Sequence, residues 1–172
     1  LIFGDSLVIN PVGTHYVFLY EKGGDQVTRI DKSDFHGQNF ERSLFKFQNN
    51  VYAFGGYGFW HSHSKLIRYN WSDQEWDLVH LNGELPDVAP ILSIKQGDSI
   101  YALYQFHPNN HKQNSFDSID FYVIDLNTLA VSRHEYTRKN ELIINIHQYQ
   151  EIGREKWSVW GKEHAISQIY NH

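Results

Sequence analysis

The chain has 172 residues, of which 41% are hydrophobic and 16% aromatic, and its formal net charge is −5. This length accommodates about one domain with a sizeable core, and the aromatic content excludes a disordered chain. The absence of cysteine excludes disulfide bonds, thiolate zinc sites and cysteine nucleophiles, and the lack of clustered Lys and Arg argues against a nucleic-acid partner.

The first residues, the hydropathy and the methionine content of the chain give further expectations. The first ten residues, LIFGDSLVIN, have no basic region and no cleavage site, so no signal peptide is predicted. No apolar run approaches the roughly 20 residues of a membrane-spanning helix. Methionine is absent, from which we expect a fragment or a processed piece of a longer chain.

Short runs rich in Val, Ile, Tyr, Phe and Trp, separated by Gly, Asn, Asp and Pro, occur along the whole chain. This pattern predicts β-strands, and helical periodicity is nearly missing. In the first unit, strands are predicted at residues 7–9, 15–20 and 26–31, with a weak edge strand near Phe35.

The second unit has the clearest pattern. Strands are predicted at residues 43–47, 51–54, 66–70 and 76–81, with a loop over residues 55–64 and a connector over residues 82–90. Within it, Asn70-Trp71-Ser72 fits a glycosylation acceptor. The same residues also fit the turn of a hairpin, and both interpretations stay open.

The third and fourth units repeat this order. Strands are predicted at residues 91–94, 100–104, 119–125 and 129–136, with a long loop over residues 105–117. The last unit has predicted strands at residues 142–147, 156–160 and 165–170.

One landmark recurs in all four units. The third predicted strand ends in an apolar or aromatic residue followed by Asp or Asn, at Ile30-Asp31, Tyr69-Asn70, Ile124-Asp125 and Tyr170-Asn171. The spacings are 39, 55 and 46 residues, and periods of about 40 to 50 residues with four strands each are typical of propeller blades. We therefore predict an all-β, propeller-like single domain over residues 1–172, with three to four four-stranded antiparallel blades at about 5–40, 42–82, 90–136 and 141–172.

The second unit also resembles a kelch repeat. It has an apolar strand, then a diglycine, then a Tyr, then a Trp, and Gly55, Gly56, Tyr69 and Trp76 match that pattern. The glycines allow a tight turn where no Cβ fits, and the flat aromatic rings are expected to fill the space between blades. A WD40 interpretation rests only on Trp76-Asp77, which stands at the wrong end of a strand.

The resemblance implies a β-propeller with four-stranded antiparallel blades. Kelch-like propellers usually have six or seven blades, so we expect either a part of a larger propeller or a homodimer that closes one. No cofactor is expected. The copper radical oxidases among kelch-like proteins need a cysteine that this chain lacks.

In such a blade, the loops between the second and third strands and the connectors between blades emerge on one face. The predicted ligand-binding residues lie on that face, since binding residues concentrate on loops held by a rigid scaffold. They are Tyr57, Phe59, Trp60, His61, His63, His107 and His111.

The His61-Ser62-His63 segment has the spacing of a metal-binding pair, because histidines at i and i+2 of a strand point the same way. No acidic ligand has a fixed spacing to the pair, so no metal is predicted. No catalytic motif such as GxSxG or a P-loop is present.

We therefore expect a binding module that recognises a protein or a glycan, rather than an enzyme. The alternative is a carbohydrate-active enzyme similar to the kelch-like sialate mutarotases, using the same face. Its candidate carboxylates are Glu84, Asp87 and Glu141. An open face favours the module, whereas a deep pocket with a carboxylate within hydrogen-bond reach of a histidine favours the enzyme.

Overall fold

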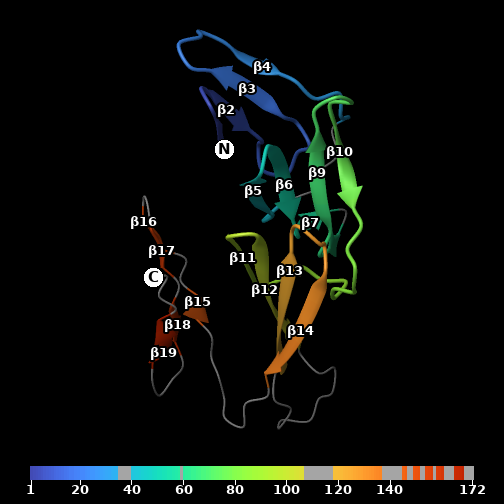
Figure 1. The fold of residues 1–172 in the computed structure, drawn as a ribbon, viewed down its shortest axis with the longest axis vertical. Coiled ribbons are helices and arrows are strands. Elements are labelled where there is room, and N and C mark those ends of the chain that lie inside the picture. The colour runs from blue at the N-terminus through green and yellow to red at the C-terminus, as the bar shows by residue number, and fades with distance from the viewer. Residues whose placement is uncertain are drawn as a thin grey trace. The chain divides into compact units, whose positions relative to one another are not determined.

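The computed structural model describes two compact units, Leu1–Phe106 with Ile119–Glu135, and His107–Ser118 with Tyr136–His172. The described residues are 1–34, 40–58, 60–106, 118–136, 145–146, 149–151, 154–156, 158–160 and 165–168. All regular structure in these residues is β-strand (Figure 1), which confirms the all-β prediction. No helix that could span a membrane occurs among them.

The first sheet is an antiparallel meander in chain order (Figure 1). Its strands are β1 (Ile2–Phe3), β2 (Ser6–Ile9), β3 (Phe18–Glu21) and β4 (Val27–Arg29). The sequence analysis missed β1, so the strand before Ile30-Asp31 is the fourth of its sheet and not the third. Two apolar residues are too short a run to stand out, and β1 exists because Ile2 and Phe3 pair with Leu7 and Ser6 across a tight turn. The strand expected near Phe35 lies outside the described residues.

The second sheet agrees closely with the prediction. Its strands are β5 (Ser43–Phe47), β6 (Asn50–Phe54), β9 (Leu66–Asn70) and β10 (Glu75–Val79), hydrogen-bonded in that order. The turn between β9 and β10 is built by Asn70, whose side-chain oxygen accepts hydrogen bonds from the backbone N–H groups of Ser72 and Asp73. Its amide nitrogen donates to Asp73 and Asp77. These four bonds confirm the turn that was predicted for this segment.

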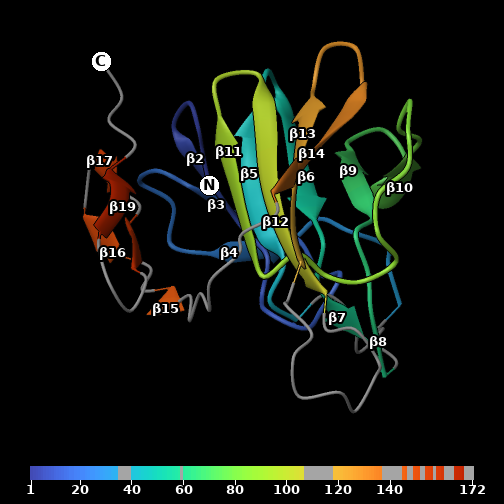
Figure 2. The same ribbon diagram turned by 90° about the horizontal axis from the view of Figure 1, so that it is seen from below.

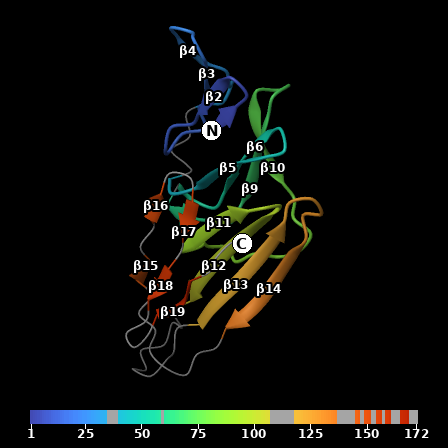
Figure 3. The ribbon, with the colours of Figure 1, turned by 60° about the vertical axis from the view of Figure 1, so that its left-hand side comes forward.

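The third sheet is again a four-stranded meander, and Figure 3 shows its strands side by side. They are β11 (Leu92–Gln96), β12 (Ser99–Phe106), β13 (Ser118–Asp125) and β14 (Val131–Tyr136). Gly97 occupies the tight turn between β11 and β12 with a φ of 54°, a backbone conformation that glycine adopts without a steric cost.

The three sheets pack on one another in chain order through two hydrophobic clusters. One cluster joins the first and second sheets and contains Val8, Val17, Val51 and Tyr69. The other joins the second and third sheets and contains Phe45, Phe47, Tyr52, Phe54, Leu66, Ile100, Ala102, Tyr104, Tyr122, Ile124 and Leu126. Strands β5 and β11 lie side by side (Figure 2), joined by a hydrogen bond between the hydroxyl groups of Ser43 and Ser93.

Tyr69 and Trp76 lie where the first and second sheets meet. Their rings are 5.5 Å apart in an edge-to-face arrangement. The hydroxyl of Tyr69 donates to the carbonyl of Ile30 at 2.9 Å, and the indole N–H of Trp76 donates to the carbonyl of His15 at 2.8 Å. These two aromatic side chains therefore join neighbouring sheets, as expected from their place in the sequence.

The second compact unit, His107–Ser118 with Tyr136–His172, contains two small antiparallel sheets in its described residues. One has the strands β15 (Asn145–Ile146), β18 (Ser158–Trp160) and β19 (Ala165–Gln168), and the other has β16 (Tyr149–Glu151) and β17 (Arg154–Lys156). The β16–β17 hairpin was not predicted. Its sequence, YQE and REK, is polar and gives no strand signal.

Candidate binding site on the β7–β8 hairpin

The segment expected to be an irregular loop after β6 contains a small hairpin of β7 (Tyr57–Gly58) and β8 (His61–Ser62). Tyr57 pairs with Ser62 and Gly58 with His61. Tyr57 also exchanges two backbone hydrogen bonds with Phe40, both of 2.9 Å. This extra pairing depends on a contact distant in sequence, which is why the local pattern did not predict a strand.

The diglycine before the hairpin sets its direction. Gly55 and Gly56 have φ angles of 67° and 118°, values that side-chain-bearing residues rarely adopt. A Cβ on Gly55 would stand only 3.1 Å from the Cδ atom of Pro90 in the connector. The expectation that these glycines occupy a turn with no room for a Cβ is therefore met at Gly55.

Trp60 is the most exposed of the large apolar side chains in the described residues, with 93% of its surface accessible. It stands at the tip of the hairpin with a φ of 62°, an unfavourable backbone conformation for a tryptophan. Tyr57 on the same hairpin is 39% exposed. An aromatic ring held in solvent by a short hairpin on a buried sheet forms a ready contact for a partner.

His61 connects the hairpin to the connector between the second and third sheets. Its Nε2 atom lies 3.3 Å from a carboxylate oxygen of Asp87. Both side chains are largely exposed, at 58% and 85%, so solvent screens their interaction. The pair places a polar donor and acceptor on the same surface as Trp60.

His63 has a different environment from His61. It lies beyond the end of β8 and is 9% exposed, and its Nδ1 accepts a hydrogen bond of 3.3 Å from the backbone N–H of Lys65. Burial, followed by the nearby charges of Lys65 and His61, lowers the pKa of His63, so the ring is neutral at physiological pH. The i, i+2 spacing suggested that His61 and His63 point the same way. Instead His61 is exposed and His63 is buried, because β8 ends between them.

A shared metal site therefore has no support from this pair. Among the residues that the structure describes, no three His, Asp or Glu side chains come together as metal ligands.

Ser64 fixes the base of the hairpin to both neighbouring segments. Its hydroxyl donates to the carbonyl of Val88 in the connector and accepts a 2.8 Å hydrogen bond from the hydroxyl of Tyr104 on β12. Tyr104 is fully buried, and burial raises its pKa to about 12. The hairpin, the connector and the end of β12 thus converge at Ser64.

The other predicted residues are distributed as follows. Phe59, His107, His111 and Glu141 lie outside the described residues. Glu84 is exposed in the connector, and no hydrogen bond joins it to the other described residues of the site. Tyr57, Trp60 and His61 lie on one short hairpin, and Asp87 is the polar neighbour of His61. Because Tyr57 pairs with Ser62 and Gly58 with His61, the side chains of Tyr57 and His61 lie on opposite faces of the hairpin.

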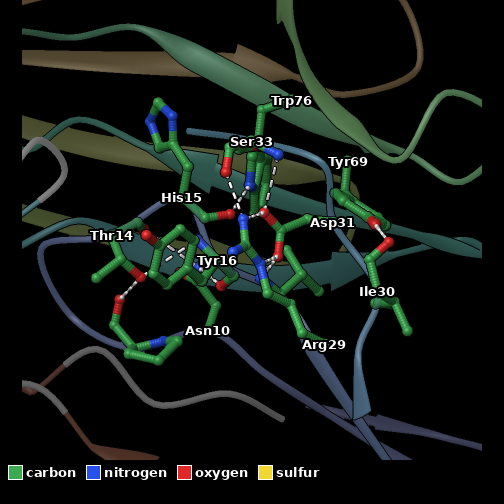
Figure 4. Close-up of polar contacts among 12 residues, drawn as sticks. Asn10, Thr14, His15, Tyr16, Arg29, Ile30, Asp31, Ser33, Tyr69 and Trp76 are labelled. Carbon is green, nitrogen blue, oxygen red and sulfur yellow. Dashed lines mark hydrogen bonds and ion pairs between the residues drawn. The ribbon is translucent and has the colours of Figure 1, made fainter. Parts of the chain in front are cut away.

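A second polar cluster was missed by the sequence analysis (Figure 4). The buried carboxylate of Asp31 accepts hydrogen bonds from the backbone N–H groups of Val17 and Ser33 and from the guanidinium of Arg29. Burial alone would raise the pKa of Asp31, but the hydrogen bonds from Arg29 and Val17 hold it below its usual value. Arg29 also stacks 3.9 Å over the ring of Tyr16. The alternation Arg-x-Asp in residues 29–31 was the available signal.

Arg42 is the other unforeseen charge. It donates a 2.9 Å hydrogen bond to the carbonyl of Thr14, and its guanidinium lies 5.1 Å from the ring of Trp76. Its Nη1 atom is buried, and none of the described residues accepts a hydrogen bond from it. Burial lowers the pKa of Arg42 to about 10, so it stays charged at neutral pH.

Elsewhere on the first compact unit, Leu1–Phe106 with Ile119–Glu135, the described residues line two open depressions. One of about 460 Å³ is lined by Phe3, Gly4, Lys46, Asn49 and Trp71, and the other, of about 430 Å³, by Tyr16, Arg29, Asp31, Lys32, Ser33 and Asp34. Neither is lined by the described residues of the hairpin, so the candidate site is not one of these depressions.

No protein-family model matches the chain, and a search of the curated proteins finds no match.

Proposed function

We propose that the chain is a binding module of the kelch-like propeller type, which recognises a protein or a glycan through the surface around the β7–β8 hairpin. The observation that carries the proposal is the exposure of Trp60. Keeping an indole in water costs free energy on the order of 2 kcal/mol relative to its burial. A partner that covers the ring recovers this free energy on binding.

The polar groups beside Trp60 support the same reading. Interfaces and sugar sites combine aromatic rings with a few fixed donors and acceptors. The His61–Asp87 pair supplies both, and Ser64 holds the base of the hairpin in place. These contacts hold the base of the hairpin before the partner arrives, which reduces the entropic cost of binding.

The propeller architecture is part of the proposal. It is supported by three consecutive four-stranded antiparallel meanders and by their packing in chain order. The contact between β5 and β11, the first strands of two successive sheets, is the arrangement expected when first strands line a common axis. The resemblance of Gly55, Gly56, Tyr69 and Trp76 to a kelch repeat points the same way.

The proposal is tested with arrays of neutral and acidic oligosaccharides and of peptides, probed with the wild-type chain. Trp60→Ala should lose at least about tenfold in affinity for any probe bound, since hot-spot aromatics contribute 2 kcal/mol or more. Leu78→Ala, on the half-exposed Leu78 of β10, is the matched control and should bind as wild type. Equal binding by Trp60→Ala, or binding of no probe at all, would overturn the proposal.

One observation favours the alternative of a carbohydrate-active enzyme. Asp87 lies within hydrogen-bond reach of His61, as an acid–base pair requires. The exposure of both side chains counts against it, because solvent reaches the pair, whereas acid–base chemistry is favoured in sites that exclude water. The alternative predicts faster interconversion of sialic acid anomers, seen by proton NMR and lost in Asp87→Asn. An unchanged rate with wild-type protein would dismiss it.

A further inference from the structure

One of the two open depressions is formed by turns of the first and second sheets, and we call it the turn pocket. It has a volume of about 460 Å³, which falls in the usual range of small-molecule sites, about 300–1,000 Å³. Asn49 directly precedes β6, whereas the β7–β8 hairpin follows β6, so the two surfaces lie at opposite ends of this strand. The pocket is lined by Phe3, Gly4, Lys46, Asn49 and Trp71.

Two aromatic rings form a corner of the turn pocket. The centroids of Phe3 and Trp71 are 5.8 Å apart, and their planes make an angle of 70°. Trp71 also packs edge to face on the buried ring of Tyr69, at 5.0 Å. It follows Asn70, whose side chain closes the turn between β9 and β10. The indole is thus held in place and is still 39% exposed, so part of its surface can stack on the apolar face of a ligand.

Lys46 brings a positive charge to the turn pocket. Its Nζ atom lies 4.3 Å from the centroid of the Phe3 ring, a cation–π contact that orients the ammonium group without neutralising it. Among the residues that the structure describes, no carboxylate pairs with Lys46 and no side-chain or backbone oxygen accepts a hydrogen bond from it. The described lining of the pocket contains no acidic residue, so the ammonium can pair with an anion.

Asn49 and Trp71 add uncharged polar groups. Both residues are exposed, and neither side chain is hydrogen-bonded to another described residue. The amide offers two N–H donors and an oxygen acceptor, and the indole offers one N–H donor. A single cation suits a ligand with one negative charge, and mixed donors and acceptors suit hydroxyl groups. A sugar ring that carries one carboxylate combines both features with an apolar ring face.

We propose that the turn pocket is a second binding site of this chain, which takes a uronate-type saccharide, a pyranose ring with one carboxylate. The carboxylate pairs with Lys46, the apolar face of the ring covers Trp71, and the hydroxyl groups exchange hydrogen bonds with Asn49. A ligand of about 13 non-hydrogen atoms on an open site binds with a dissociation constant on the order of 1 mM. A single sugar bound this weakly is lost from a washed array, which separates this site from the hairpin site.

NMR titration of the nitrogen-15-labelled chain with methyl β-D-glucuronoside, up to about 20 mM, tests the proposal. The chain has five tryptophans, and Trp71→Phe identifies the indole N–H signal of Trp71. In wild type this signal should shift and saturate. Methyl β-D-glucoside, which lacks the charge, should bind about tenfold more weakly, because the charged hydrogen bond to Lys46 is lost. Sodium acetate, which lacks the ring, should also bind about tenfold more weakly.

Lys46→Gln should weaken binding of the glucuronoside about tenfold and leave binding of the glucoside unchanged. Lys95→Gln is the matched control. Lys95 is also half-buried on a strand, with its Nζ 5.8 Å from the ring of Phe47, but it does not line the pocket. It should bind as wild type, as should Trp60→Ala, which alters only the hairpin. Lys46→Arg keeps the charge and should retain most of the affinity, and circular dichroism confirms that each variant is folded.

A Trp71 signal that does not move up to about 20 mM glucuronoside would overturn the proposal. Acetate or the glucoside binding as tightly as the glucuronoside would also overturn it, as would equal losses in Lys46→Gln and Lys95→Gln. Loss of binding in Trp60→Ala, with unchanged binding in Lys46→Gln, would assign the sugar to the hairpin and reject the turn pocket. Failure of this site and failure of the hairpin site are therefore distinguishable.

Discussion

The hydroxyl of Tyr69 donates a hydrogen bond of 2.9 Å to the backbone carbonyl oxygen of Ile30, which directly follows β4 of the first sheet. The Tyr69 ring is 1% exposed on β9 of the second sheet. Burial raises the pKa of Tyr69 to about 12, so the hydroxyl remains a donor throughout the physiological pH range. One side chain thus provides both apolar and polar contact between two sheets.

Tyr69→Phe should lower the free energy of unfolding by about 1 kcal/mol, because the carbonyl of Ile30 loses its donor while the ring packing remains. Urea denaturation followed by circular dichroism measures this loss. Tyr57→Phe is the control, since Tyr57 is partly exposed on the hairpin. Equal stability of Tyr69→Phe and wild type would show that the hydrogen bond does not stabilise the sheet junction.

The carboxylate of Asp31 should make the folded state less stable in acid. Its pKa in the folded state lies below the ordinary value, so the folded state favours the carboxylate. The contribution is therefore present above the unfolded-state pKa of about 4 and is lost as the pH falls through the folded-state pKa.

Asp31→Asn should lower the free energy of unfolding at neutral pH by about 2 kcal/mol, since the charged partner of Arg29 is removed. The free energy of unfolding should also vary less with pH in the acid range than it does in wild type. Denaturant unfolding measured across the acid range checks both effects. Asp25→Asn, at an exposed carboxylate, is the control. An acid dependence as steep in Asp31→Asn as in wild type would contradict the assignment.

Gly55→Ala tests the close approach of the hairpin to the connector. Alanine at a positive φ costs roughly 1–2 kcal/mol, and the new Cβ would also press on Pro90 at 3.1 Å. Gly97→Ala provides the matched control, because Gly97 has a φ of 54° and no atom within 4 Å of its would-be Cβ. Gly55→Ala should therefore be the more destabilising of the two in thermal unfolding. A larger loss in Gly97→Ala would contradict the role of Pro90.

Arg42→Met is expected to be neutral or stabilising by about 1 kcal/mol, although it removes a hydrogen bond to Thr14. The Nη1 atom of the buried guanidinium has no acceptor among the described residues, and replacing a poorly compensated buried charge with an apolar side chain of similar length often raises stability. Guanidinium chloride unfolding measures the difference. Arg42→Ala should be less stable than Arg42→Met, because it leaves a cavity beside Trp76. A clear loss in Arg42→Met would reveal a partner for the charge.

The candidate site was only partly predictable. Trp60 was predicted to lie on a loop, because it stands in the sequence between a diglycine and a polar run, and its side chain is exposed. The sequence grouped His61 with His63, yet one lies on the surface beside Asp87 and the other is buried beside Lys65. Their different surroundings come from the end of β8 and from a connector 26 positions away, neither of which a short motif reveals.

The sequence by itself located the strands of the second and third sheets. Ser43–Phe47 and Leu66–Asn70 of the second sheet were predicted with the bounds observed, and the bounds predicted in the third sheet differ from those observed by at most two residues. Apolar alternation and turn-forming Asn and Gly residues act within a few positions of the chain. Only the tertiary structure decided that Ile2–Phe3 forms the edge of the first sheet, that Ser64 joins three segments, and that Asp31 is buried against Val17. The physical reason is that strand pairing and polar burial depend on groups brought together from distant positions, and local propensity carries no record of them.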